Sequence, residues 1–273
     1  MLTFISFGSG SSGNCYYLAT DTDALLIDIG VALKDSKTVK GLKTNCREYG
    51  VSLSKIRHIL VTHDHADHIK SVGTFSYQYD VPVYATRKVH AGITRNYCVK
   101  RKLAPNVVRF IEKEKPLQLG DFLVTPFEVP HDSSDNVGYF IEAGGVAFCI
   151  ITDAGCVTEQ MQQYIGRAQY LVIESNHDIE MVQNGPYPKF LKERILSQSG
   201  HLSNIDSAKA VAEHMTEQLR HVWLCHLSEE NNHPELARKT YESVLRSYGI
   251  VPGTDLQLEV LKRTMPTGPY ELG

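Results

Sequence analysis

The sequence lacks the features that mark several specialised classes of protein. None of its six cysteines forms a CxxC pair, and they are too sparse for a disulfide-stapled secreted protein. No apolar run approaches the roughly 20 residues that span a bilayer. The N-terminal stretch MLTFISFGSG has neither the basic start nor the long apolar segment of a signal peptide. We therefore expect a cytoplasmic protein with reduced, mostly buried thiols and no membrane association.

The chain also has little net charge and no repetitive segment. Its 28 basic and 31 acidic residues give a formal net charge of -3, which argues against nucleic-acid binding through overall basicity. With 42% hydrophobic and 22% charged residues, the composition is that of an ordinary globular protein. No fixed-period repeat and no Pro/Ser-rich linker divides the chain, so we expect one domain over residues 1–273.

Strand and helix patterns occur in both halves of the chain. Short apolar runs indicate strands at 2–7, 15–20, 24–30, 58–62, 81–85, 107–110, 121–130, 136–143, 146–152, 170–175 and 221–228. Helical patterns lie at 36–49, between Thr86 and Lys102, near 187–198, at 204–219 with Ser203 and Asp206 as a capping box, and from Pro234 to just before Gly249. This distribution predicts a layered α/β sandwich. Residues after about 228 are expected to pack on it as a C-terminal helix and strand.

The strongest chemical signal is the HxHxDH run formed by His63, Asp64, His65, Asp67 and His68, directly after an expected strand. Imidazoles and a carboxylate on one tight loop can point into a common volume, and such ligands suit Zn, Mn or Fe. Surface histidines with a helix-capping aspartate are the alternative. Further candidate ligands stand at the ends of three later strands, namely His131, Asp153 and His226. Together with the loop they make a set of seven.

HxHxDH, His131, the TDAG at 152–155 and the HLS at 226–228 resemble the ordered motifs of the metallo-β-lactamase superfamily. The resemblance implies a four-layer αββα sandwich with two divalent metal ions. It assigns one ion to His63, His65 and His131, the other to Asp67, His68 and His226, and a bridging role to Asp153. It further implies a hydroxide shared by the ions and oriented by Asp67. Asp64 is not a ligand in this pattern, so orienting an imidazole and capping a helix both stay open for it.

Two later segments resemble those of tRNase Z. ESNHD, at 174–178, is similar to the HEAT segment of that family, and GHLSN, at 200–204, to its GHSS-type segment. The resemblance makes His201 the candidate catalytic residue that donates a proton or stabilises the phosphorus centre, with support from Glu174 or His177. In the alternative, GHLSN is a capping loop in which Ser203 and Asn204 begin the helix and His201 is merely exposed.

Taken together, SFGSGSSGN, THDHADH, HD at 131, TDAG, ESNHD, GHLSN and HLSEENN resemble the YycJ (WalJ) family over nearly the full chain. That resemblance implies a metal-dependent nuclease, with 5′ to 3′ exonuclease action on DNA. The short stretch between Asp153 and His226 leaves no room for a β-CASP insertion, and no tRNase Z arm is evident, so DNA is favoured over RNA. One alternative is a small-molecule hydrolase, such as a cyclic phosphodiesterase or lactonase, with the same ions. A regulatory module with a vestigial site is another, and the complete ligand set argues against it.

Two further segments could contact phosphate. Basic residues are concentrated and acidic ones absent between Val81 and Ile111, in a chain that is otherwise slightly acidic; they are Arg87, Lys88, Arg95, Lys100, Arg101, Lys102 and Arg109. This segment could guide a phosphate backbone toward the metals, with Tyr97 or His90 stacking on a base, or it could be a solvated helix face. The Gly/Ser turn at 8–14 is either a phosphate-binding nest or a simple hairpin turn.

Overall fold

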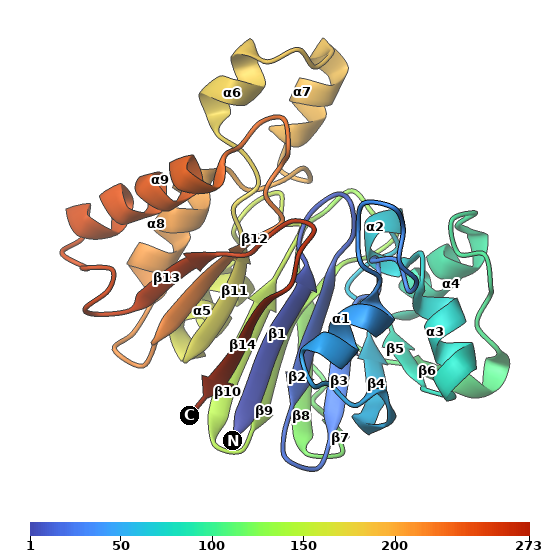
Figure 1. The fold of residues 1–273 in the computed structure, drawn as a ribbon. Coiled ribbons are helices and arrows are strands. Elements are labelled where there is room, and N and C mark those ends of the chain that lie inside the picture. The colour runs from blue at the N-terminus through green and yellow to red at the C-terminus, as the bar shows by residue number, and fades with distance from the viewer.

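The computed structural model describes all 273 residues and contains two seven-stranded sheets packed face to face (Figure 1). The first sheet contains β1 (Leu2–Gly8), β2 (Cys15–Ala19), β3 (Ala24–Ile27), β4 (Ile56–Leu60), β5 (Val83–Ala85), β6 (Val108–Phe110) and β14 (Thr267–Leu272). The second contains β7 (Leu117–Leu119), β8 (Phe122–Glu128), β9 (Val137–Ala143), β10 (Val146–Ile151), β11 (Tyr170–Glu174), β12 (His221–Cys225) and β13 (Gln257–Val260). The strand orders are β14-β1-β2-β3-β4-β5-β6 and β13-β12-β11-β10-β9-β8-β7.

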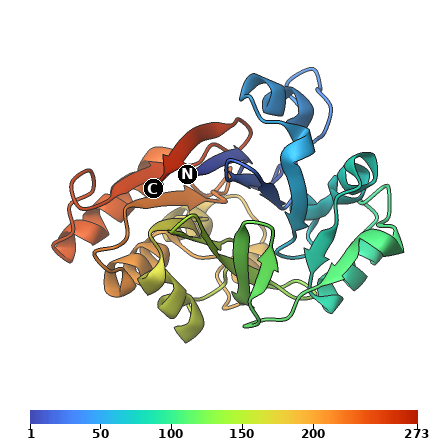
Figure 2. The same cartoon turned by 90° about the horizontal axis from the view of Figure 1, so that it is seen from below.

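Helices cover the outer faces of both sheets (Figures 1 and 2). The first sheet carries α1 (Leu42–Glu48), α2 (Ala66–Ile69), α3 (Val72–Tyr79) and α4 (Arg87–Arg95), and the second carries α5 (Glu159–Arg167), α8 (Asn204–His214) and α9 (Pro234–Ser247). Two short helices, α6 (Ile179–Asn184) and α7 (Lys189–Ile195), project beyond the edge of the sandwich (Figure 1). The predicted αββα arrangement is confirmed. No helix combines the length and apolarity needed to cross a membrane.

The central strands are apolar on both faces because each sheet is covered on both sides. In β10, Phe148 and Ile150 pack in the core between the sheets, whereas Cys149 and Ile151 pack under the helices. Successive side chains of a strand point to opposite faces, so one unbroken apolar run fills two separate cores. Trp223 of β12 lies fully buried in the core between the sheets, against the ring of Phe4 at 4.8 Å.

Parallel pairing places many strand ends at one edge of the molecule. Strands β3 to β6 run parallel in the first sheet and β10 to β13 in the second. The carboxyl ends of these strands, and the loops that follow them, are where polar side chains can converge without breaking either core.

Several helices are shorter than the sequence pattern predicts. The helix expected between Thr86 and Lys102 stops at Arg95, where the Asn96 side chain accepts a hydrogen bond from the Cys98 N–H and forms a turn. The helix expected over 204–219 ends at His214, since Met215 is extended. The helix expected over 36–49 begins only at Leu42.

Other details match the expectation more closely. Ser203 caps α8 by accepting a hydrogen bond from the Asp206 N–H at 3.1 Å, and Pro234 occupies the first turn of α9. Near 187–198 the helix α7 begins after Pro188. The C-terminal segment contributes α9 and two strands instead of one, because β14 pairs with β1 in the first sheet while β13 pairs with β12 in the second. The short β7 was also absent from the sequence pattern.

Candidate metal centre

All seven candidate ligands converge at the shared edge of the two sheets. His63, His65, Asp67 and His68 follow β4, His131 follows β8, Asp153 follows β10 and His226 follows β12. Donor atoms of these seven residues form three overlapping groups in which all atoms lie within 4.8 Å of one another, namely His63, His65 and His131; Asp67, His68 and His226; and His63, His68 and Asp153. In a fourth such group, Glu174 and His201 join Asp153 and His226. Imidazole nitrogens and carboxylate oxygens at this spacing could hold divalent metal ions.

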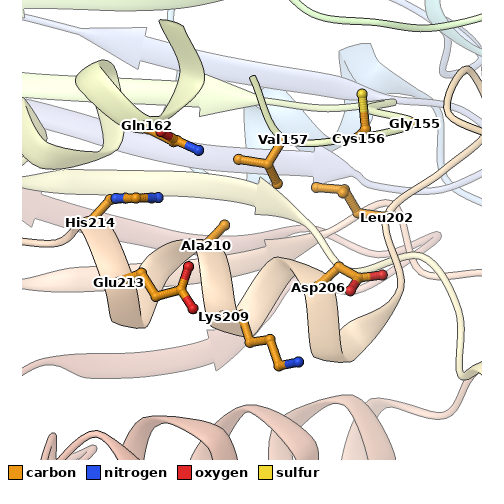
Figure 3. Close-up of a pocket in the computed structure, with 10 residues that line it drawn as sticks. All are labelled: Gly155, Cys156, Val157, Gln162, Leu202, Asp206, Lys209, Ala210, Glu213 and His214. Carbon is orange, nitrogen blue, oxygen red and sulfur yellow. The ribbon is translucent and has the colours of Figure 1, made fainter. Parts of the chain in front are cut away.

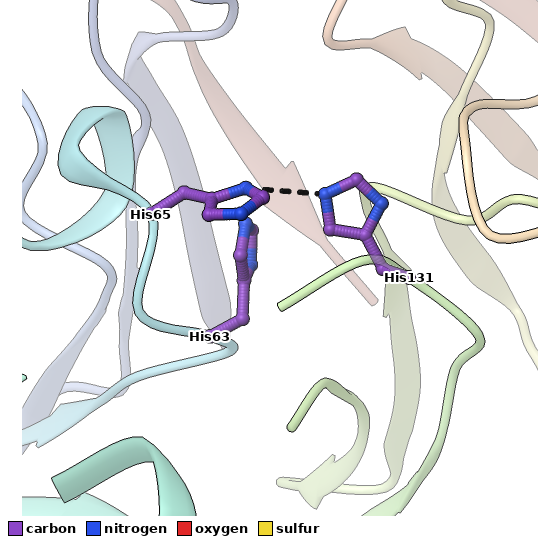
Figure 4. A group of neighbouring side chains, drawn as sticks. All are labelled: His63, His65 and His131. Carbon is purple, nitrogen blue, oxygen red and sulfur yellow. Dashed lines mark hydrogen bonds between the residues drawn. The ribbon is translucent and has the colours of Figure 1, made fainter. Parts of the chain in front are cut away.

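The first group consists of three imidazoles around one point (Figure 4). Nε2 of His131 lies 3.2 Å from Nδ1 of His65, and Nδ1 of His131 donates to the Gly200 carbonyl at 2.9 Å. Nε2 of His63 is buried and has no hydrogen-bond partner. A buried nitrogen without a partner is costly unless it has a ligand, so this atom fits a bound cation. Burial, with the neighbouring His68, lowers the pKa of His63 and keeps the imidazole in its neutral, ligating form.

The second group lies directly beside the first. Nε2 of His226 is 3.3 Å from Oδ2 of Asp67, and Nε2 of His68 is 3.6 Å from the same oxygen. Asp153 stands between the groups, 3.2 Å from Nε2 of His68 and 3.7 Å from Nε2 of His131. Burial raises the pKa of Asp153, but His226 and His68 outweigh it and bring the pKa well below the usual range. The carboxylate is therefore ionised and available to both groups.

Each of three candidate ligands is oriented by a hydrogen bond from its other ring nitrogen. Nδ1 of His68 donates to Asp28 at 2.7 Å, and Nδ1 of His226 lies 2.9 Å from Glu174. Nδ1 of His63 lies 3.0 Å from the Thr62 hydroxyl. Such bonds fix the tautomer and aim Nε2 at the cleft. Sequence reasoning missed Asp28, although a lone acid at the end of the apolar run ALLI was the available signal.

Backbone strain coincides with the same strand ends. Asp28, Asp153 and His226 have φ values of 59°, 54° and 52°, in the left-handed region that residues with a side chain seldom adopt. Each follows a buried strand and is itself buried. Packing thus holds these three residues in costly conformations, a pattern that concentrates at functional sites.

Glu174, at the end of β11, connects the second group to His201. Its Oε1 accepts from Nδ1 of His201 at 2.8 Å, while its Oε2 accepts from the backbone N–H groups of Ala154 and Leu202. Burial raises the pKa of Glu174, but the nearby His201 outweighs it and lowers the pKa to about 2. His201 remains partly exposed at the rim, with its ring centroid 4.9 Å from that of His131, and no hydrogen bond engages its Nε2.

The other residues predicted near His201 lie in the surrounding framework. His177 is buried, and neither ring nitrogen has a hydrogen-bond partner, so no such bond links it to His201. Ser203 caps α8, and Oδ1 of Asn204 accepts from the Ser175 hydroxyl at 2.6 Å and from the Asn232 amide at 2.9 Å. These contacts hold together the loops that carry Glu174 and His201.

Asp64 braces the ligand loop from outside. Its carboxylate accepts from the N–H and the hydroxyl of Ser134, at 3.0 and 2.6 Å, and its carbonyl accepts from the Asn96 amide at 2.9 Å. A Cβ added at Gly92 of α4 would lie 1.7 Å from Oδ2 of Asp64. Asp64 therefore joins the loop to α4 and to the segment after His131, and no imidazole is hydrogen-bonded to it.

The basic segment is divided by the fold. Arg95 lies beside the site, with Nη2 3.4 Å from the Ser134 hydroxyl, and Tyr97 next to it is 84% exposed. Arg101 instead stacks on Tyr77 at 3.7 Å, and Lys102 donates to the Asn96 carbonyl at 2.6 Å. The remaining basic residues are placed as follows: Arg87 stacks on Phe110, Arg109 donates to the carbonyls of Asn106 and Val108, and Lys88 and Lys100 are exposed.

Comparison with known proteins identifies the family. Residues 22–226 match the model of the "Beta-lactamase superfamily domain". The chain is 35% identical over 267 residues to "Exodeoxyribonuclease YycJ" of Bacillus anthracis, covering 97% of each protein. It is 34% identical over 250 residues to "Exodeoxyribonuclease WalJ" of Streptococcus pneumoniae, covering 92% of this chain and 90% of that protein. The chain belongs to the YycJ/WalJ family of the β-lactamase superfamily. The fold also matches human tRNase Z, short form, with a TM-score of 0.62 at 15% identity, over 98% of this chain and 100% of that one.

In this YycJ/WalJ-family protein the Gly/Ser turn reaches the metal centre. Nδ2 of Asn14 lies 2.9 Å from Nε2 of His68 and 3.3 Å from Oδ2 of Asp67. The Ser9 hydroxyl accepts from the backbone N–H of His226 at 2.9 Å. The turn therefore links β1 and β2, as a hairpin turn does, and also contacts the candidate ligands of the second group.

The protein also has a pocket that the candidate metal ligands do not line. It measures about 300 Å³ and lies between α5 and α8 (Figure 3). Its lining residues are Gly155, Cys156, Val157, Gln162, Leu202, Asp206, Lys209, Ala210, Glu213 and His214. None of the seven candidate ligands is among them.

Proposed function

We propose that this protein is a metal-dependent DNA exonuclease that degrades its substrate from the 5′ end. The observation that carries the proposal is the gathering of seven imidazole and carboxylate donors beside His201, whose Nδ1 is held by Glu174. The relatives that match almost the whole chain are named exodeoxyribonucleases, and these names support DNA as the substrate class. They favour this proposal over the small-molecule hydrolase.

His63, His65 and His131 would hold one divalent cation, and Asp67, His68 and His226 a second, with Asp153 between them. The donor set fits Zn or Mn, with Fe as a further option. When bound, two such ions supply Lewis-acid stabilisation of phosphate charge and a water activated for attack. Asp28 and Glu174 keep His68 and His226 aimed at the centre.

Two side chains of the protein would act on the attacking water and on the leaving group. The Asp67 carboxylate, at the mouth of the second group, orients the attacking water. His201 uses its unengaged Nε2 to donate a proton to the departing oxygen or to stabilise charge on the phosphate. Burial opposes the charged imidazole, but Glu174 outweighs burial and raises the pKa of His201, which favours the protonated donor.

We further propose that residues 1–273 act as one domain in the cytoplasm. The six cysteines are free, which suits a reducing compartment. Arg95 and the exposed basic residues Lys88 and Lys100 would guide the phosphate backbone toward the centre.

The test is degradation of 5′-phosphorylated duplex DNA, with a matched RNA, by Mn-loaded and Zn-loaded protein. Stepwise shortening from the 5′ end is expected for DNA. Asp67→Ala should abolish it, and His201→Ala should reduce it about 100-fold or more. Lys189→Ala, an exposed change on α7, serves as the control. Absence of cleavage of either polymer by fully metallated protein would sink the nuclease assignment and direct attention to cyclic phosphodiesters and small esters.

A further inference from the structure

The short helix α7 brings an arginine to the edge of the metal centre. α6 and α7 project beyond the sandwich (Figure 1). The last turn of α7 contacts the loop that follows His131, because it carries Arg194, whose guanidinium bonds Asp132. There the Nε and Nη2 groups of Arg194 both bond the carboxylate of Asp132, the Nη2 bond measuring 2.9 Å. Oδ1 of Asp132 lies 3.5 Å from Nε2 of the candidate ligand His131. One carboxylate thus separates the guanidinium from the centre.

The base of α7 is joined to the loop that carries His201. The N–H of His201 donates to the Ile195 carbonyl at 3.1 Å, and Nδ1 of His131 donates to the Gly200 carbonyl. A Cβ at Gly200 would lie 2.3 Å from the carbonyl oxygen of Arg194. The position of Arg194 relative to His131 and His201 is therefore fixed by close backbone packing.

The bidentate pair leaves one edge of the guanidinium unused. Asp132 occupies Nε and Nη2, whereas Nη1 makes no hydrogen bond, and 46% of the Arg194 side chain is exposed. The guanidinium is planar, so fixing one edge also fixes the direction of the Nη1 donors. A pre-oriented, exposed pair of N–H groups beside a metal centre is suited to an anionic oxygen.

Three other arginines of the chain are committed to local structure. Arg263 donates to three backbone carbonyls, Arg238 bonds Glu235 and Glu242, and Arg101 stacks on Tyr77. Arg194 differs because its partner is adjacent to a candidate metal ligand and its second edge stays free.

We propose that Arg194 binds, through Nη1, a backbone phosphate next to the scissile one, and that Asp132 is the positioning residue that holds it. The proposal rests on the nuclease function proposed above. It assigns α7 as one wall of the path along which the substrate strand reaches the metals.

The test separates binding from cleavage. Affinity for a fluorescent 5′-phosphorylated single-stranded DNA is measured by anisotropy in an Asp67→Ala background, with and without Arg194→Ala. Arg194→Ala should weaken binding about tenfold and reduce the slope of log K against log salt by about 0.7. Arg194→Lys should recover part of the affinity. Lys189→Ala removes a charge that is 90% exposed on the same helix and should change affinity less than twofold.

Turnover supplies the second readout. In the Asp67 wild-type background, Arg194→Ala should raise KM for DNA about tenfold, with a much smaller effect on bis(p-nitrophenyl) phosphate, which has no neighbouring phosphate to bind. Unchanged DNA affinity and salt slope would overturn the proposal. So would an equal loss on both substrates together with a loss of metal, since that result assigns the Arg194–Asp132 pair to loop anchoring alone. Wild-type protein that binds DNA as predicted but cleaves neither polymer would refute the proposed function and leave this contact standing.

Discussion

Glu174 accepts a hydrogen bond from Nδ1 of His201 at 2.8 Å, and this bond decides which nitrogen of His201 faces the cleft. The same carboxylate oxygen lies 2.9 Å from Nδ1 of His226. One buried acid therefore orients both the proposed proton donor and a candidate metal ligand. A change at Glu174 should consequently affect catalysis and metal binding together.

Glu174→Gln keeps the shape of the side chain but removes its charge. Because both imidazoles lose their charged acceptor, we expect kcat to fall about 100-fold and metal affinity about tenfold. Glu180→Gln, on exposed α6, is the matched control. Steady-state kinetics and metal titration measure the two effects, and a loss of kcat without any change in metal affinity would contradict the shared role.

Asp28 tests the orientation of His68. Its carboxylate lies 2.7 Å from Nδ1 of His68 and also accepts from the N–H and hydroxyl of Thr62. Asp28→Asn should lower metal affinity by about 10-fold to 100-fold, because the imidazole loses the partner that fixes its tautomer. Competition with a chelator measures this affinity. Asp21→Asn, in an exposed turn, should match the wild type, and equal affinity of all three proteins would exclude the role given to Asp28.

We expect Gly92→Ala to destabilise the protein, although replacing glycine by alanine usually stabilises a helix. In a helix interior this change normally stabilises by about 1 kcal/mol. Here the added Cβ would lie 1.7 Å from Oδ2 of Asp64, so either α4 or the ligand loop must shift. We expect the free energy of unfolding to fall by about 1–3 kcal/mol and activity to fall with it. The control Ala91→Ser, on the exposed face of α4, should change neither the free energy of unfolding nor the activity. If urea titrations showed that Gly92→Ala stabilises the protein, Asp64 would have to move freely.

His177 makes stability depend on pH. Burial lowers its pKa to about 4, whereas the ordinary value is about 6.5. Between these values the unfolded chain binds more protons than the folded one, so the free energy of unfolding falls as the pH falls. Neither ring nitrogen has a hydrogen-bond partner, so His177→Phe should fold well.

When the pH falls from 7.5 to 5, the free energy of unfolding should decrease by about 1–2 kcal/mol less in the His177→Phe protein than in the wild type. Urea unfolding at both pH values measures the difference. Parallel losses in the two proteins would assign the acid sensitivity to other groups, and His221, whose pKa burial also lowers to about 4, is the next candidate.

The sequence contained the information for most of the fold. Long apolar runs such as those of β8 to β12 predict their strands, because a strand buried on both faces has no polar positions. Helix ends were less predictable, since α4 stops where the Asn96 side chain forms a turn and α8 stops where Met215 becomes extended. The short β7 forms only as the edge partner of β8 in a tight hairpin. The separation of β13 and β14 into different sheets depends on pairing with β12 and with the distant β1.

The candidate site divides in the same way. The HxHxDH run and the polar residues after the later strands are local patterns. The αββα topology that their resemblance to the superfamily implies is confirmed. Their chemistry is visible in residue type and spacing alone. The partners that orient these residues come from other elements, as Asp28 does for His68. The same holds for Arg194 of α7, which is oriented by Asp132.

By itself, the sequence determined the two buried sheets, the helix layers and the set of imidazoles and carboxylates at the strand ends, because these follow from apolar periodicity and donor chemistry. Only the tertiary structure decided that Glu174 bonds both His201 and His226, and that Arg95 contacts Ser134 while Arg101 stacks on Tyr77. It also decided that α7 places Arg194 beside Asp132. Those contacts join residues far apart in the chain, and their geometry is set by the packing of the two sheets and their loops.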